Sequence, residues 1–349
     1  MRSQPKYARR SGCLLSPSET DALVFALPAL GALAASGRRF VAVAERHLAP
    51  LATTLPGVVE VVSDLAEPDA LARCEEAVVL SRGPGDGISQ ELARLRHLRR
   101  LGIPRRWGYG VRGLAGLGLP GLLLRWLLAP AVRPPFSSVL QARHRSEDFR
   151  ELLQAMEVPP PASWVPRLEI GDEARRAARE RLERGGIPAD ASPVVALIPG
   201  GRLVASARER IPPASRWPWQ CFAGLTRELR QRVAGLRCLL VAGREPLWPA
   251  VRVHEETARF VPLIGPDLDA FGLAALLAVS DLAVAADGEL LHLAAAVGTP
   301  TVALFGPTDP RRRAPRGEHH RLLAAPGGDL RRLEAPTVLE TALEVLDAF

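Results

Sequence analysis

One stretch of the chain, residues 280–310, limits the possible folds more than any other. Residues 282–286 are a short apolar run with the length and composition of a buried strand. A polar turn follows, and small apolar residues from 290 to 297 then predict a helix that a glycine and a proline end. Residues 301–305 form a second apolar run directly afterwards. A strand, a tight turn, a helix and a strand in this order predict a βαβ crossover between two parallel strands.

The turn of this unit consists of Asp287, Gly288 and Glu289. In a parallel sheet, the turn between a strand and the next helix lies at the carboxyl edge, where ligands bind. The first amides of that helix have no partner within the helix and carry partial positive charge, so the turn predicts a site for phosphate or diphosphate. The alternative is that the unit is only architectural, because every α/β protein contains such units.

The rest of the chain alternates between strand-like and helix-like patterns. Short apolar runs predict strands at residues 13–15, 40–44, 58–62, 77–80, 105–109, 194–198, 238–242 and 260–264. Helical patterns lie at residues 22–35, 144–156, 172–184, 219–233 and 335–346. This alternation predicts an α/β protein with doubly wound parallel sheets. Residues 114–128 are apolar and rich in glycine without a regular period, so they fit either a mobile segment or a buried helix pair.

The composition is that of a globular enzyme with more than one core, since 47% of the residues are hydrophobic. The net charge of +7 favours an anionic partner, and nearly all of the positive charge is arginine because Lys6 is the only lysine. No window combines aromatic with dense basic residues, which argues against nucleic acid and favours an anionic membrane surface or a phosphorylated glycolipid.

The four cysteines are too far apart for a zinc site and too few for a disulfide scaffold, which predicts a reduced, cytoplasmic protein. No run has the length of a signal peptide's apolar region or of a membrane span. Residues 158–161, with three consecutive prolines, are the best candidate for a linker between two domains.

Residues 280–310 resemble the C-terminal signature of glycosyltransferase family 9, the heptosyltransferase-like enzymes. The resemblance is carried by Asp287 five residues ahead of His292, a run of alanines, Gly298-Thr299-Pro300, and Phe305-Gly306-Pro307-Thr308-Asp309-Pro310. It extends over most of the chain through Ala26-Leu27-Pro28-Ala29-Leu30, Pro199-Gly200-Gly201, Arg216-Trp217-Pro218 and Gly243-Arg244-Glu245.

The resemblance implies a GT-B fold, in which two Rossmann-like domains face each other across a cleft. Residues 1–161 are then the acceptor-side domain, residues 162–330 bind the nucleotide sugar, and residues 331–349 form a helix that packs back towards the N-terminal domain. The implied donor is a nucleotide sugar, usually ADP-heptose, with a glycolipid or polysaccharide acceptor and no further cofactor. The implied donor site comprises Gly200, Gly201, Glu245, Asp287, Gly288, Glu289 and His292, with Glu245 accepting hydrogen bonds from the ribose hydroxyls.

Three positions depart from the family pattern. The family's general base follows a glycine, whereas this chain has Asp21 followed by Ala22, so the carboxylate lies one residue earlier. Asp21 is either the general base or only the cap of the first helix. Glu19 is a second carboxylate near this position. Ser215 stands where the family has a lysine, which leaves Arg216 as the nearest cation. In the turn, Glu289 replaces a glycine and would repel a diphosphate unless its side chain points away.

The leading hypothesis is an inverting transferase that needs no metal, with Asp21 as the base and Arg216 and helix amides stabilising the leaving diphosphate. The rival hypothesis is a non-catalytic descendant of the same scaffold that binds a sugar nucleotide, a glycan or a partner protein. A third interpretation, an enzyme of the same fold acting on UDP-sugars, explains residues 305–310 poorly.

Overall fold

The computed structural model describes residues 11–16, 20–63, 71, 74–80, 95–109, 123, 127, 131–132, 143–200, 212–243 and 247–348. The chain divides into two compact units, Met1–Pro166 and Arg167–Phe349. The boundary follows the proline-rich segment 158–161 by a few residues. Each unit contains a six-stranded sheet in which every pair of neighbouring strands is parallel.

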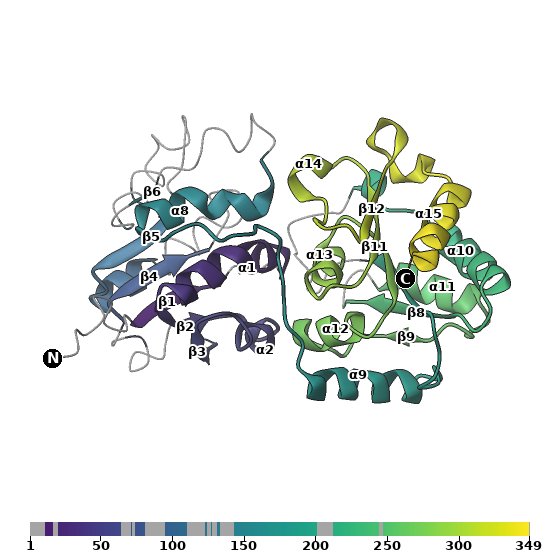
Figure 1. Cartoon of the computed structure of the whole chain (residues 1–349), viewed down its shortest axis with the longest axis horizontal. Helices are drawn as coiled ribbons and strands as arrows, with labels where there is room; N and C mark the ends of the chain where they lie inside the picture. The colour runs from purple at the N-terminus through teal and green to yellow at the C-terminus, as the bar shows by residue number, and fades with distance from the viewer. Residues whose placement is uncertain are drawn as a thin grey trace. The chain divides into compact units, whose positions relative to one another are not determined.

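The sheet of the first unit has the strand order β3-β2-β1-β4-β5-β6 (Figure 1). Its strands are β1 (Ser11–Leu15), β2 (Arg39–Val43), β3 (Val58–Val62), β4 (Glu76–Val79), β5 (Arg105–Tyr109) and β6 (Ala131–Val132). Its helices are α1 (Thr20–Ala35), α2 (Ala49–Ala52), the 3-10 helix η1 (Arg145–Phe149) and α8 (Arg150–Ala155), all within the described residues. The order 3-2-1-4-5-6 is the Rossmann order, which reverses direction beside the first strand.

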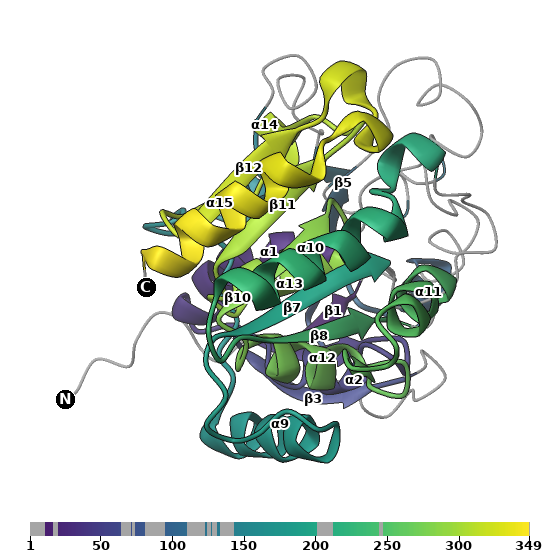
Figure 2. The ribbon, with the colours of Figure 1, turned by 90° about the vertical axis from the view of Figure 1, so that its right-hand side faces the viewer.

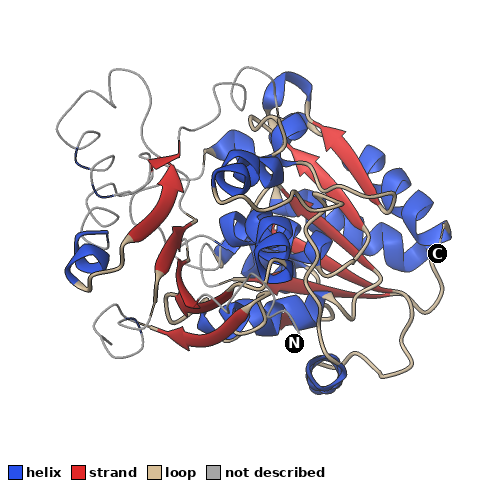
Figure 3. Ribbon diagram, turned by 60° about the vertical axis from the view of Figure 1, so that its left-hand side comes forward, coloured by secondary structure: helices blue, strands red, loops and turns tan. Residues whose placement is uncertain are grey.

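The sheet of the second unit has the order β12-β11-β10-β7-β8-β9, which is the same Rossmann order when its strands are counted from β7. Its strands are β7 (Val194–Gly200), β8 (Arg237–Ala242), β9 (Leu263–Ile264), β10 (Leu282–Ala286), β11 (Thr301–Phe305) and β12 (His320–Ala324). The helices that cover it are α9 (Asp172–Arg184), α10 (Trp219–Arg232), α11 (Trp248–Glu256), α12 (Ala270–Leu277), α13 (Glu289–Ala296) and α15 (Ala335–Asp347). Figure 3 shows these strands flanked by helices. Two doubly wound units of this kind confirm the predicted fold class.

The C-terminal helix α15 lies beside α10 over the second sheet (Figure 2). Its apolar face, formed by Val338, Leu339, Ala342 and Val345, is buried in the core of the second unit. This core also contains residues of β7, β8, β10 and β11. The helix is therefore an integral part of the second unit; that it also packs towards the N-terminal domain stays a prediction.

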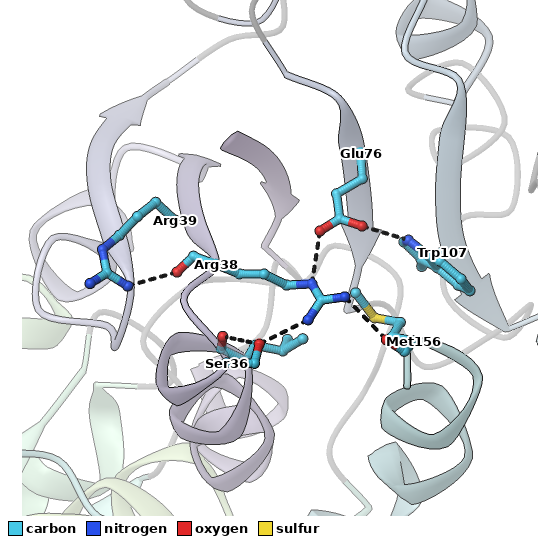
Figure 4. Close-up of polar contacts among 7 residues, drawn as sticks. Ser36, Arg38, Arg39, Glu76, Trp107 and Met156 are labelled. Atoms are coloured by element: carbon cyan, nitrogen blue, oxygen red, sulfur yellow. Dashed lines mark hydrogen bonds and ion pairs between the residues drawn. The ribbon is translucent and has the colours of Figure 1, made fainter. Parts of the chain in front are cut away.

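A polar cluster is buried at the amino end of the first sheet (Figure 4). Glu76, the first residue of β4, is fully buried and accepts hydrogen bonds from Arg38 Nε at 2.9 Å and from Trp107 Nε1 at 3.0 Å. Arg38 Nη2 donates to the carbonyl of Met156, just after α8, at 3.1 Å. These hydrogen bonds join β4 to β5 and to the residue before β2, and they join that residue to the end of α8. Because this is the amino end of the strands, the cluster lies away from the edge where ligands bind.

Several predicted elements differ from the structure. The first helix begins at Thr20 rather than at residue 22, so Asp21 lies inside its first turn and not at the N-cap. The apolar run 260–264 pairs only at Leu263–Ile264, and the side chain of Phe260 is 74% exposed. The segment 114–128 lies almost wholly outside the described residues, which leaves its two interpretations open.

Across the described ranges, no helix is both long and apolar enough to cross a membrane.

Candidate functional site

The candidate site lies at the carboxyl edge of the second sheet. Asp287 directly follows β10, and its backbone N–H donates to the carbonyl of Leu304 in β11 at 3.0 Å. Gly200 ends β7, the neighbour of β10 on the other side, and the register pairs Ala285 with Ile198. Because the two strands are parallel, Gly200 at the end of β7 and Asp287 directly after β10 lie at the same carboxyl edge of the sheet. The two predicted loops therefore start at the same edge.

The carboxylate of Asp287 is held by two basic side chains from different elements. His292, one turn into α13, places Nε2 2.8 Å from Asp287 Oδ1. Arg313, the last residue of α14 (Pro310–Arg313), donates from Nε to Oδ1 at 3.0 Å and to Oδ2 at 2.8 Å. Exposure of these side chains is 6% for Asp287, 2% for His292 and 15% for Arg313. This group is the Asp287–His292–Arg313 cluster.

The hydrogen bonding places a proton on one ring nitrogen of His292. An ionised carboxylate only accepts, so the short contact to Asp287 requires a proton on His292 Nε2. Arg313 Nη2 lies 3.2 Å from the same nitrogen. That nitrogen has no lone pair left once it carries the proton, so the guanidinium contacts the ring without donating to it.

The surroundings of Asp287 keep its carboxylate ionised. Burial by itself raises the pKa, but the hydrogen bond and charge of His292, the charge of Arg313 and a hydrogen bond from Thr308 together lower the pKa below its ordinary value of 3.8. The cluster therefore contains one carboxylate whose charge is matched by the guanidinium.

Gly288 and Glu289 form the start of α13. Gly288 is the N-cap with extended backbone angles, φ 177° and ψ 177°, and Glu289 is the first helical residue. The N-terminal amides of α13 thus begin one residue after Asp287, at the sheet edge predicted for an anion. A carboxylate in the first turn also stabilises its own helix, which gives Glu289 a structural interpretation besides that of a ligand contact.

A segment of the chain before α10 packs against the same edge. The 3-10 helix η2 (Pro213–Ser215) places the carbonyl of Ala214 only 2.6 Å from where a Cβ on Gly306 would lie. Trp217 Nε1 donates to the carbonyl of Leu333 at 2.9 Å and fixes the end of this segment. Arg216 stands between them, partly exposed, and its buried Nε has no hydrogen-bond partner in the part of the chain that the structure describes.

Of the remaining predicted site residues, one lies in the first unit and two lie outside the described residues. Asp21 is a residue of the first unit, 5% exposed within the first turn of α1. Gly201 and Glu245 lie outside the described residues, although Glu245 follows β8, the neighbour of β7. Among the described ranges, no group of three or more His, Cys, Asp or Glu side chains is arranged to hold a metal ion.

Arg313 and Thr308 are partners of Asp287 that the sequence pattern did not predict. Arg313 is 26 residues away from Asp287 in the chain, and no local pattern connects them. The signal that was present is the run of three arginines, residues 311–313, directly after the Thr308-Asp309-Pro310 motif. A cationic run that follows a predicted anion site closely in sequence is a reason to test for contact between them.

Comparisons with known proteins give one family. The family model described as glycosyltransferase family 9 (heptosyltransferase) matches residues 138–342. Lipooligosaccharide heptosyltransferase 2 of Haemophilus influenzae is 27% identical over 140 residues, which are 40% of this chain and 38% of that protein. Lipopolysaccharide heptosyltransferase 1 of Escherichia coli is 30% identical over 125 residues, which are 35% of this chain and 36% of that protein. Each match thus spans less than two fifths of the relative's length.

The fold extends further than the sequence similarity. The structure of the ADP-heptose lipopolysaccharide heptosyltransferase II of E. coli superposes with a TM-score of 0.76 at 20% identity. The superposition covers 97% of this chain and 99% of that one. Both sheets described above therefore belong to the GT-B fold.

Proposed function

The chain belongs to glycosyltransferase family 9, and we propose that it transfers a heptose, or a related sugar, from ADP-heptose to a lipid-linked or lipopolysaccharide-type acceptor. The observation that carries the proposal is the 287–289 turn, where Asp287 directly follows β10, α13 begins, and Gly200 ends the neighbouring strand. An edge of this kind suits a diphosphate, because helix amides point at it and glycines let the ligand approach the backbone. The matched relatives act, by their names, on lipooligosaccharide and lipopolysaccharide.

Chemically, such a transfer requires that the bond between the anomeric carbon and the donor diphosphate breaks while an acceptor hydroxyl attacks. We assign the stabilisation of the leaving diphosphate to the amides of α13 and to Arg216, whose buried Nε can donate a charge-assisted hydrogen bond. Attack from the face opposite the leaving group inverts the anomeric centre, and in this scheme no metal takes part.

A base must take the proton of the attacking hydroxyl. We assign this role to Asp21, the carboxylate nearest to the family's base position, with Glu19 as the alternative. The assignment requires the first turn of α1 to supply a carboxylate to the acceptor. Asp21 is 5% exposed within that turn, so this role requires that acceptor binding make its carboxylate accessible.

Nucleotide binding tests the donor assignment. Thermal unfolding measured with ADP, UDP, GDP and their sugars should show a rise in melting temperature with ADP and ADP-heptose, since a ligand of the native state stabilises it by mass action. A rise with UDP or GDP only would contradict the ADP donor, and no rise with any of them would contradict the donor site.

A second function, a non-catalytic scaffold that binds a sugar nucleotide or glycan, is favoured by two observations. Asp21 is buried inside a helix turn, and Ser215 replaces the cation that the family pattern has at that position. This candidate predicts nucleotide-sugar binding without transfer, so a transfer assay distinguishes the two functions.

A further inference from the structure

The helix α14 carries three consecutive arginines, and two of them have distinct and well-defined partners. Arg311 bonds to Asp309 on its own helix, from Nε to Oδ1 at 3.1 Å and from Nη2 to Oδ2 at 3.0 Å, and its side chain is 75% exposed. Arg313 instead contacts Asp287, which directly follows β10, and the Arg313 side chain is 15% exposed. One arginine is thus a local surface pair, whereas the other joins two elements at the candidate donor site.

The carboxylate of Asp287 has little capacity left for a ligand. Its two oxygens offer about four lone-pair positions. His292 takes one on Oδ1, Arg313 Nε contacts both oxygens, and Thr308 adds a further hydrogen bond. Asp287 is therefore held in place by the protein, and its effect on a ligand is mainly that of its charge.

That charge would oppose a diphosphate. A carboxylate directly before α13 places a negative charge beside the amides that would bind the anion, and Glu289 adds a second one in the first turn. The guanidinium of Arg313, within 3.0 Å of both Asp287 oxygens, cancels the first of these charges. It also contacts the His292 ring, so one side chain fixes both members of the cluster.

We propose that Arg313 is a positioning residue of the donor site, which neutralises Asp287 and fixes the carboxylate and the His292 ring at the start of α13 so that a nucleotide diphosphate binds there. The inference rests on the proposed function, because it takes the diphosphate of the donor as the ligand. It adds a residue that acts through Asp287 and not through a contact with the phosphate.

Calorimetric titration with ADP tests the proposal on the whole chain. Arg313→Gln removes the guanidinium that offsets the charge of Asp287 and should weaken ADP binding by about tenfold, the size of one charge-assisted interaction. Arg311→Gln removes the same charge from the same helix, two residues away, and should leave the affinity unchanged. Equal affinities for the wild type and Arg313→Gln would overturn the proposal.

A second substitution separates neutralisation from direct contact with the phosphate. In Asp287→Asn/Arg313→Gln the buried carboxylate is gone, while the Asn oxygen can still accept from His292, so ADP affinity should return to that of Asp287→Asn alone. Because this variant carries no unmatched buried charge, it also controls for misfolding of the single variant. Affinity that stays at the level of Arg313→Gln would overturn the proposal in favour of direct contact. Failure of the wild type to bind ADP would contradict the proposed function itself, and this inference with it.

Discussion

At the scale of single residues, the proposed chemistry depends most on Asp21. If Asp21 is the general base, Asp21→Asn should lower the transfer rate by ~10²–10⁴, the usual contribution of a general base, and leave ADP affinity unchanged. Asparagine has nearly the same shape and stabilises a helix N-terminus about as well, so stability should change little. Initial rates with saturating donor measure the effect. A fully active variant would exclude Asp21 and direct attention to Glu19.

Asp287 makes stability depend on pH. Burial raises its pKa, but His292, Arg313 and Thr308 outweigh burial, so the folded-state pKa lies below the ordinary value of 3.8. A carboxyl with a lowered pKa stabilises the fold above that ordinary value, and the contribution disappears as the pH falls through the folded-state pKa. Asp287→Asn should therefore be less stable than the wild type by about 1–3 kcal/mol at neutral pH.

Urea unfolding of both proteins between roughly pH 7 and pH 3 measures this difference. The gap in the free energy of unfolding should shrink at the acid end, because the carboxyl binds a proton there in the unfolded wild-type chain more readily than in the folded one. A gap that stays constant over the whole range would show that the charge of Asp287 is not what stabilises the cluster.

The buried cluster around Glu76 should be the most sensitive polar group described in the first unit. Glu76→Gln removes the charge that matches Arg38 and leaves a buried guanidinium unpaired, which typically costs about 3–5 kcal/mol of unfolding free energy. Glu60→Gln, on the exposed side of β3, is the matched control and should change stability by less than about 1 kcal/mol. Equal effects of the two substitutions would contradict the buried network shown in Figure 4.

The sequence pattern could indicate some contacts within the candidate site and not others, for a physical reason. Asp287 and His292 are five positions apart, close enough for a strand, turn and helix pattern to bring them together. Arg313 contacts them only because of the tertiary fold. A run of arginines in a sequence by itself predicts a solvent-exposed surface. Asp21 is a local prediction that was wrong. The sequence predicted Asp21 as the N-cap of a helix that starts at residue 22, whereas α1 starts at Thr20.

Among the elements, the segment 212–216 packs closely against Gly306, the residue directly after β11. A Cβ on Gly306 would lie 2.6 Å from the carbonyl of Ala214 and 3.2 Å from Leu330 Cγ, so backbone would have to move. Gly306→Ala should displace the segment that carries Arg216, cost about 1–3 kcal/mol of stability, and weaken ADP binding.

Gly224 provides the matched control for this prediction. It lies within α10, and a Cβ there would meet nothing within 4 Å. Gly224→Ala should raise stability by about 0.5–1 kcal/mol, as alanine does within a helix, and leave ADP affinity intact. Melting temperatures and ADP titrations of the two variants give the comparison; if Gly306→Ala binds ADP as well as Gly224→Ala does, Arg216 does not depend on this contact.

Elements were predictable where an apolar run coincided with a buried strand. The runs at residues 58–62, 282–286 and 301–305 agree with β3, β10 and β11 to the residue. The run at 260–264 has the same composition, but only its last two residues pair with β8 while Phe260 faces solvent. Hydrophobicity alone does not show whether a neighbouring strand is present to pair with.

At the scale of the whole molecule, the two sheets share one strand order although their sequences differ in length and composition. The alternation of strands and helices predicted this architecture, because parallel strands need crossovers and crossovers are right-handed. The specific motifs, by contrast, gather in the second unit, where residues 280–310 form a single βαβ unit. The fold could thus be predicted from the pattern of strands and helices in the described ranges, whereas the proposed function rests on one edge of one sheet.

We claim that this edge of the second sheet binds a nucleotide sugar for transfer. The most direct measurement is a transfer assay, in which the chain is incubated with ADP-heptose and a lipopolysaccharide core that lacks the heptose, and mass spectrometry detects both products. We predict that the acceptor gains one heptose and that an equal amount of ADP is released. Binding of ADP-heptose without either product, with a range of acceptors, would contradict the claim and establish the scaffold function instead.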